Sequence, residues 1–189
     1  SEGHIYDSNT YSIASSIAAA GGIPNILGIA RDNIEDLESK LSLAASSDLL
    51  ITSAGVSKGD YDLVKAVLMN NGDMNFWSVR MRPAKPLAFG ILQPTKNHTL
   101  PLIGLPGNPV SAMVAFEMFA RPAIRKMLGF TNLHRPRVNG FLTSPIYNHD
   151  GRRVYARVEV TSKEGIYYAS PTGPQGSNIL TSMTSANGL

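Results

Sequence analysis

The sequence contains no cysteine among its 189 residues. Disulfide bonds, thiolate zinc sites and a cysteine nucleophile are therefore excluded, and any bound metal ion must be held by oxygen or imidazole ligands. The sequence also lacks an apolar run of the roughly 20 residues that a membrane-spanning helix needs. Its first residues, Ser1 to His4, lack the basic and then apolar pattern of a secretory signal. We expect a soluble, cytoplasmic protein with no membrane partner.

Acidic residues are scarce in the second part of the chain. Residues 80–189 contain 4 Asp/Glu and 13 Lys/Arg, a net charge of +9, whereas residues 1–79 contain 10 Asp/Glu and 4 Lys/Arg, a net charge of −6. The positive residues are not interleaved with aromatic residues and form no run of five, so nucleic acid is not the expected partner. A small anionic ligand or an acidic partner subunit fits this charge distribution better.

Helices and strands alternate in the predicted order of elements over residues 1–130. Apolar residues at helical spacing, together with capping signals, predict helices over 10–20, 32–44, 60–70 and 109–129. Short apolar runs predict strands over 26–30, 48–52, 75–81, 87–92 and 100–105. We expect the last two strands to form an antiparallel hairpin at one edge of the sheet, and Pro122 to kink or end the last helix. This alternation is typical of a three-layer α/β/α domain with a parallel or mixed sheet.

The helical period disappears after residue 130, and we place a domain boundary there, with one domain over 1–130 and a second over 131–189. Alternating apolar and polar residues over 153–161, a turn over 162–165 and a return strand over 166–169 predict a hairpin. The second domain has few large apolar side chains and would be marginal by itself. We therefore expect a small, incomplete β domain.

Three segments after predicted strands carry residues suited to binding an anion, since ligands in open α/β sheets bind at the carboxyl ends of strands. Small residues and glycines over 52–62 expose backbone N–H groups at a helix start, which suits a phosphate, although a flexible turn has the same composition. The segment 80–86 holds three cations and is stiffened by two prolines, either for an oxyanion or as a charged edge loop. In the segment 104–111, the string Pro-Gly-Asn-Pro indicates a tight turn that contacts a ligand or simply starts a helix.

Taken in this order, these strings resemble the molybdopterin molybdenumtransferase family, of the MoeA and gephyrin E-domain type. The resemblance covers nearly the whole chain, through the segments 3–9, 28–32, 48–62, 82–90, 104–111 and 182–189. It implies a MogA/MoaB-like molybdopterin-binding domain and the last step of molybdenum cofactor biosynthesis. In that step, adenylyl-molybdopterin and molybdate are converted to molybdenum cofactor and AMP, with Mg²⁺ as the metal cofactor.

The resemblance also implies roles for individual residues. The catalytic carboxylates of the family fall on Asp7, Asp48 and Asp62, and Asp62 is the candidate metal ligand. The contacts to pterin and phosphate fall on Ser53, Gly55, Val56, Ser57, Gly59, Pro106, Gly107, Asn108 and Pro109. The contacts to molybdate fall on Arg82, Lys85, Pro86, Ser111, Arg157 and Ser177. Structural alternatives exist for four of them: Asp7 as a helix cap, Asp48 at a strand start, Asp62 on an exposed first turn and Arg157 on the polar face of a hairpin.

The chain departs from the family pattern at two positions where glycine is usual, which are Ala54 and Ala84 here. An alanine there requires either a negative φ or a tolerated strain. Family members also carry further segments before and after this region, so we expect a chain truncated at both ends that binds better than it catalyses.

The resemblance implies a homodimer for the full-length protein and a possible second partner in the preceding adenylyltransferase. Three alternative functions are adenylyl transfer to molybdopterin, nucleotide hydrolysis and a non-catalytic binding or scaffold module. The segment 82–86 and the β domain count against the adenylyltransferase.

Overall fold

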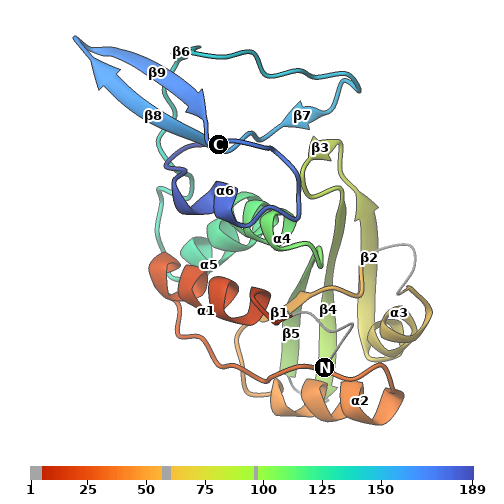
Figure 1. Cartoon of the computed structure of the whole chain (residues 1–189). Helices are drawn as coiled ribbons and strands as arrows, with labels where there is room; N and C mark the ends of the chain where they lie inside the picture. Colours follow the sequence, from red (N-terminus) through yellow and green to blue (C-terminus); the bar gives the residue numbers. More distant parts are fainter. Residues whose placement is uncertain (1–5, 57–60, 96–97) are drawn as a thin grey trace.

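A four-stranded mixed sheet forms the centre of the protein. The computed structural model describes residues 6–56, 61–95 and 98–189. The strand order is β1 (Leu50–Ser53), β5 (His98–Leu105), β4 (Pro86–Thr95) and β2 (Gly72–Ser78), and only β1 and β5 are parallel. The predicted antiparallel hairpin is therefore confirmed as β4 and β5. Its predicted place at an edge is wrong, because β1 pairs with one side of the hairpin and β2 with the other, so the hairpin is central (Figure 1).

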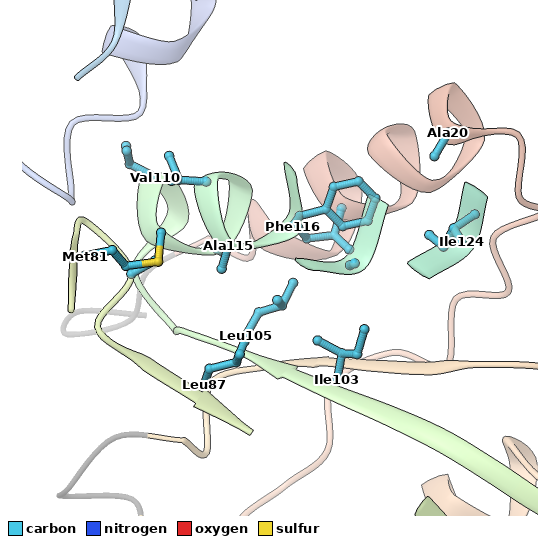
Figure 2. Packing of buried hydrophobic residues seen from close by; sticks show 14 residues of the cluster. Ala20, Met81, Leu87, Ile103, Leu105, Val110, Ala115, Phe116 and Ile124 are labelled. Atoms are coloured by element: carbon cyan, nitrogen blue, oxygen red, sulfur yellow. The ribbon is translucent and has the colours of Figure 1, made fainter. Parts of the chain in front are cut away.

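Helices cover both faces of this sheet. Along β5, Leu100 and Leu102 face a core with α2 (Ile34–Leu43) and α3 (Tyr61–Asn70). Ile103 and Leu105 face the opposite core, under α1 (Asn9–Ala20) and the helix that begins at Pro109 (Figure 2). Side chains alternate between the faces of a strand, and burying each of these Leu or Ile side chains stabilises the fold by roughly 1.5–3 kcal/mol. The predicted three-layer α/β/α architecture is confirmed.

The first part of the chain follows the prediction for its helices but not for its first strand. Helix α1 ends at Gly21, whose φ of 100° gives the left-handed cap that glycine favours. Helix α2 begins two residues later than predicted and is capped by Asn33, whose side chain accepts from the Asp36 amide at 2.8 Å. Residues 26–30 form no strand, because Gly28 has a φ of 78° and the segment is largely exposed. The strand predicted there is wrong.

The last helix of this part continues through its proline. It consists of α4 (Pro109–Ala115), a π-helical turn η1 (Phe116–Ala120) and α5 (Arg121–Met127). The amide of Arg121 donates to the carbonyl of Phe116, five residues earlier. Pro122 has no N–H and its ring excludes the regular helical path. The wider π turn accommodates Pro122, so the helix does not end there but continues to Met127.

The C-terminal part is built from short strands and one short helix, α6 (Thr181–Thr184). Strands β8 (Val158–Lys163) and β9 (Ile166–Pro171) form the predicted hairpin, which projects from the body, and β6 (Gly140–Leu142) pairs with β9 (Figure 1). Residues 153–157 do not extend this hairpin as predicted. Instead β7 (Arg153–Val154) pairs in parallel with β3 (Met81–Arg82), and this two-stranded ribbon joins the C-terminal part to the first 130 residues. In the described part of the chain, no helix has both the length and the apolarity needed to cross a bilayer.

Candidate functional site

Two loops meet at one edge of the central sheet. Strands β1 and β5 are parallel, and their carboxyl ends lie side by side because Ser53 is paired with Leu105. The small-residue loop leaves β1 here, and the Pro-Gly-Asn-Pro turn leaves β5. The amide of Ala54 donates to the carbonyl of Leu105 at 3.1 Å, which extends the contact into the loops. This is the edge at which open α/β sheets bind their ligands.

Asn9 joins these two loops to the first turn of α1. Its Nδ2 donates to Oγ of Ser53 at 2.6 Å and to the carbonyl of Gly107 at 2.7 Å. Its Oδ1 is buried and has no hydrogen-bond partner within residues 6–56, 61–95 and 98–189. An unpaired buried acceptor costs roughly 1–3 kcal/mol, so a ligand that donates a hydrogen bond here would remove that cost. This role of Asn9 could not be predicted from the sequence, because an asparagine before a helix indicates a cap and not a link to distant loops.

The predicted pterin-binding residues divide between the rim of this edge and the core. Gly107 and Asn108 are exposed and Ser53 and Pro109 are half-buried, whereas Gly55, Val56 and Pro106 are buried. Val56 packs in the core beneath the sheet and does not face the rim. Gly107 lies close to the opposite loop, since an added Cβ would be 3.3 Å from Cβ of Ala54. Ser57 and Gly59 lie outside the described residues.

Ser177 contacts the same turn from the C-terminal part of the chain. Nδ2 of Asn108 donates to Oγ of Ser177 at 3.1 Å, and the amide of Val110 donates to the Ser177 carbonyl at 3.2 Å. Ser111 is buried in the first turn of α4, three residues after Asn108. The structure therefore brings two predicted molybdate residues, Ser111 and Ser177, to the Pro-Gly-Asn-Pro turn.

Two of the three predicted catalytic carboxylates, Asp7 and Asp48, lie apart in the described part of the chain. Asp7 caps α1, because its two carboxylate oxygens accept from the amide and the hydroxyl of Thr10. Burial opposes ionisation of Asp7, but the hydrogen bonds from Thr10 and the Asn9 amide outweigh it and lower the pKa. Asp48 is exposed and precedes β1, at the end of this strand opposite to Ser53. Asp62 lies in the first turn of α3, and its side chain is outside the described residues.

Two of the predicted molybdate residues line one hollow. Arg82 and Arg157, 75 positions apart, border a cavity of about 450 Å³ together with Tyr147 and Gln175. A cavity of this size is within the range of about 300–1,000 Å³ that small-molecule sites occupy. Lys85 is exposed and Pro86 is the half-buried first residue of β4.

Arg157 is a buried cation with neutral partners. Only 1% of its surface is exposed, its Nε donates to Oγ of Ser182 at 3.1 Å, and one terminal nitrogen donates to the carbonyl of Gly176 at 3.1 Å. Burial lowers the pKa of its guanidinium. Within the described ranges it forms no ion pair with a carboxylate. A buried charge is costly unless it is paired, so this position favours the entry of an anion. The observed burial of Arg157 is inconsistent with the alternative place on the polar face of a hairpin.

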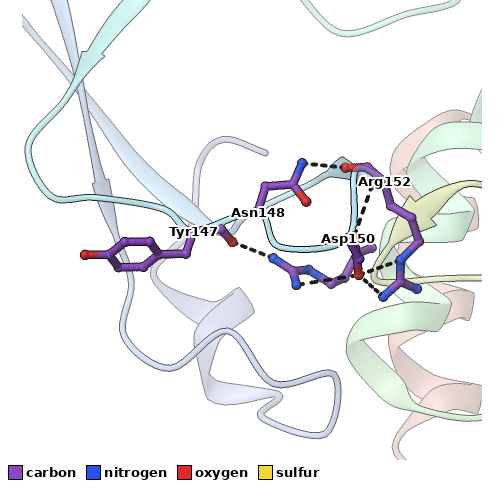
Figure 3. Close-up of polar contacts among 5 residues, drawn as sticks. Tyr147, Asn148, Asp150 and Arg152 are labelled. Atoms are coloured by element: carbon purple, nitrogen blue, oxygen red, sulfur yellow. Dashed lines mark hydrogen bonds and ion pairs between the residues drawn. The ribbon is translucent and has the colours of Figure 1, made fainter.

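Arg82 is half-exposed and is held from the other side of the hollow. It donates to the carbonyl of Tyr147 at 2.7 Å and lies 3.8 Å from a carboxylate oxygen of Asp150. Figure 3 shows Asp150 beside Arg152, with which it also forms an ion pair. Hydrogen bonds from the side chain and the amide of Arg152, with the charge of Arg82, lower the pKa of the exposed Asp150 to about 2. Arg82 is therefore oriented by a backbone carbonyl and by one carboxylate, Asp150, that remains ionised at any physiological pH.

Comparison with known families assigns both parts of the chain. Residues 1–126 match the family described as "Probable molybdopterin binding domain", and residues 139–189 match the "MoeA C-terminal region (domain IV)". These two matches cover most of the chain, including every predicted site residue.

Individual relatives agree with these matches. Molybdopterin molybdenumtransferase 2 of Mycobacterium tuberculosis (strain ATCC 25618 / H37Rv) is 34% identical over 194 residues, covering 99% of this chain and 46% of that protein. Gephyrin of Dictyostelium discoideum is 37% identical over 186 residues, covering 87% of this chain and 26% of that protein. The crystal structure of a molybdopterin biosynthesis moea protein from Pyrococcus horikosii superposes with a TM-score of 0.74 at 26% identity, covering 99% of this chain and 44% of that chain. The chain thus spans less than half the length of these relatives.

Proposed function

This chain belongs to the family of probable molybdopterin binding domains, and from that premise we propose that it provides the pterin-binding and oxyanion-binding portion of a molybdopterin molybdenumtransferase. The proposed reaction inserts molybdate into adenylyl-molybdopterin, giving molybdenum cofactor and AMP as the last step of the biosynthesis. The relatives that bear this name support the proposal, as does the match of residues 139–189 to the MoeA C-terminal region.

The observation that carries the proposal is the pair of arginines in one hollow. Molybdate is a dianion, and two cationic residues, Arg82 and Arg157, border the same cavity. The guanidinium group matches the geometry of an oxyanion because it donates two parallel hydrogen bonds. Burial of Arg157 strengthens its electrostatic attraction, since the effective dielectric constant is lower there than in water. An entering dianion would take the place of the Asp150 carboxylate at Arg82, leaving Asp150 to Arg152.

The edge of the sheet provides the second half of the proposed site. The exposed turn at Gly107 and Asn108 and the half-buried Ser53 offer backbone and side-chain groups for a phosphate or pterin. Ser177 connects this turn to the C-terminal part that also holds Arg157. The chain's residues would thus bind the two substrates and orient them relative to each other, which lowers the entropic part of the barrier.

Magnesium belongs to the proposal only through Asp62. The described residues contain no group of three His, Asp or Glu side chains that would hold a metal ion. Asp7 is occupied as a helix cap, and Asp48 lies before β1, at the end of this strand opposite to Ser53. The described residues therefore do not fit a magnesium site by themselves.

The full-length protein's assembly and location are part of the same proposal. A homodimer, delivery of substrate by the preceding adenylyltransferase and a cytoplasmic location rest on the family resemblance alone. The boundary between domains 1–130 and 131–189 is also proposed, on the loss of helical period after residue 130. The alternative of an adenylyltransferase leaves residues 139–189 unexplained.

Calorimetric titration of molybdate into the chain tests the oxyanion site. Arg82→Gln and Arg157→Lys should each weaken binding at least about tenfold, because a charge-assisted hydrogen bond contributes roughly 1.5–3 kcal/mol. Lys163→Gln removes the same charge from the exposed end of β8 and should change binding less than about twofold by screening. Unchanged molybdate binding in both arginine variants would contradict the proposal. Circular dichroism would confirm that each variant is folded.

A further inference from the structure

The geometry points to a second anion site, on the opposite face of the β3–β7 ribbon, for a phosphorylated heterocycle of mononucleotide size. A hollow of about 630 Å³ lies there, bordered by Arg80, Arg152, Arg153, Phe119 and Tyr155. The family resemblance implied no ligand contact for any of these five residues. The inference does not depend on the proposed molybdate site.

The ribbon separates two hollows because its side chains alternate. Met81 is paired with Arg153 and Arg82 with Val154, and paired residues of neighbouring strands point to the same face. Arg82 and Val154 line the hollow of about 450 Å³. Met81 and Arg153 line the hollow of about 630 Å³. The two cavities therefore share a wall but take different side chains from it.

The second hollow has an excess of positive charge. Three arginines border it, and Arg152 is the one that pairs with Asp150 (Figure 3). Arg80 and Arg153 are exposed and form no ion pair with any residue that the structure describes. Their backbones are joined, since the amide of Arg153 donates to the carbonyl of Arg80 at 3.0 Å. Two guanidinium groups, one directly before β3 and one at the start of β7, suit a phosphate, which accepts bidentate hydrogen bonds from arginine.

Aromatic side chains form another part of the wall. Phe119 and Tyr155 are half-buried and border the hollow together with Met81. Phe119 belongs to the π turn η1, a rare helical geometry that is frequent at functional sites. Flat apolar surfaces beside guanidinium groups favour a planar ring that carries an anionic group. A phosphorylated heterocycle satisfies both parts of the wall, whereas inorganic phosphate uses only the arginines.

Titration with inosine monophosphate, followed by chemical shifts of the backbone amides, tests this site. Inosine monophosphate is preferred as the probe because AMP is a product of the proposed reaction and would be expected at the first site. Shifts should concentrate at residues 79–81, 119 and 151–155, and inosine and inorganic phosphate should each bind at least tenfold more weakly. The double variant Arg80→Gln/Arg153→Gln should weaken binding of the nucleotide at least tenfold. Lys163→Gln should change it less than twofold.

Two further variants separate the contributions of the wall. Phe119→Leu and Tyr155→Leu should each weaken inosine monophosphate several-fold while leaving phosphate binding unchanged, with thermal unfolding used to confirm the fold. Two results would overturn the inference: equal binding of phosphate and nucleotide, or nucleotide binding that is unchanged in the double arginine variant. Molybdate binding should be unchanged in that double variant. If the unchanged chain does not bind inosine monophosphate, but its molybdate binding still depends on Arg82 and Arg157, this inference is refuted and the proposed function stands.

Discussion

The side-chain amide of Asn108 donates a hydrogen bond to the hydroxyl of Ser177, 3.1 Å away and 69 residues later in the chain. Asn108 stands directly before α4 and Ser177 lies in the loop before α6. A second bond, from the amide of Val110 to the Ser177 carbonyl, runs beside it. This pair of contacts positions the C-terminal part of the chain over the edge of the central sheet.

The effects of replacing Asn108 and Ser177 on the free energy of unfolding should therefore be coupled. In a double-mutant cycle of Asn108→Ala and Ser177→Ala, we expect a coupling of about 0.5–1 kcal/mol in the free energy of unfolding, since the bond is exposed. Denaturation by urea measures it. Pairing Asn108→Ala with Ser185→Ala, which lies after α6 and is exposed, serves as the control and should be additive. A Ser177 cycle that is equally additive would show that the contact contributes nothing.

Asn9 should contribute more, because it connects three segments. Asn9→Ala removes the bonds to Ser53 and Gly107 and should lower the free energy of unfolding by about 1–2 kcal/mol. Removal of the unpaired Oδ1 offsets part of this loss. Ser15→Ala, on the exposed side of the same helix, should change stability by less than about 0.5 kcal/mol. Pterin binding measured on both variants should fall only for Asn9→Ala. Equal binding by the two variants would show that the contacts of Asn9 do not contribute to the proposed site.

The sequence predicted those parts of the fold that depend on local signals. Gly21 as a helix end, the alternation that forms β8 and the turn at Glu164 and Gly165 all follow from a few neighbouring residues. Residues 26–30 have the apolar run of a strand, but whether such a run pairs depends on distant segments. The same reason explains why the hairpin of β4 and β5 is central and why β7 leaves the predicted strand to pair with β3.

The candidate site was predicted less completely than the fold. The family resemblance selected Arg82 and Arg157, but only the fold shows that they share a hollow and that Arg157 is buried without a carboxylate partner among the described residues. Nothing in the local sequence distinguishes Arg80 and Arg153 from solvent-exposed charges. Their proximity results from the parallel pairing of β3 with β7, which joins segments about 70 residues apart.

The two alanines that replace family glycines have left-handed backbones, with φ of 79° at Ala54 and 70° at Ala84. The strain expected from the sequence is therefore present. Ala54 is exposed, and Ala54→Gly should raise the free energy of unfolding by roughly 0.5–1 kcal/mol, since left-handed alanine costs about 1–2 kcal/mol and glycine loses part of this gain as entropy. Ala84 is buried, so the loss of its methyl group should offset the relieved strain. Ala84→Gly should therefore leave the free energy of unfolding nearly unchanged.

A helical alanine gives a control of opposite sign for these substitutions. Ala18→Gly, on the exposed side of α1, should lower the free energy of unfolding by about 1 kcal/mol. Thermal unfolding measured for all three variants gives the comparison. Destabilisation by Ala54→Gly of the same size as Ala18→Gly would show that the positive φ carries no strain.

The cap formed by Asp7 should make stability depend on acid pH. Hydrogen bonds from Thr10 and the Asn9 amide, opposed by burial, lower the pKa of Asp7 in the folded state below its ordinary value of 3.8. A carboxylate whose folded pKa is depressed contributes stability that is fully present above the unfolded pKa and is lost as the pH falls through the folded pKa. Urea denaturation between pH 7 and pH 2.5 should therefore show a smaller loss of stability in acid for Asp7→Asn than for the unchanged chain.

At pH 7 the Asp7→Asn variant should be less stable than the unchanged chain, because asparagine caps the helix without the charge that favours its N-terminus. Asp48→Asn removes an exposed carboxylate that lies before β1 and caps no helix, and the acid profile of Asp7→Asn is compared with that of this control. An Asp7→Asn profile parallel to that of the unchanged chain would show that the Thr10 contacts do not favour the ionised form.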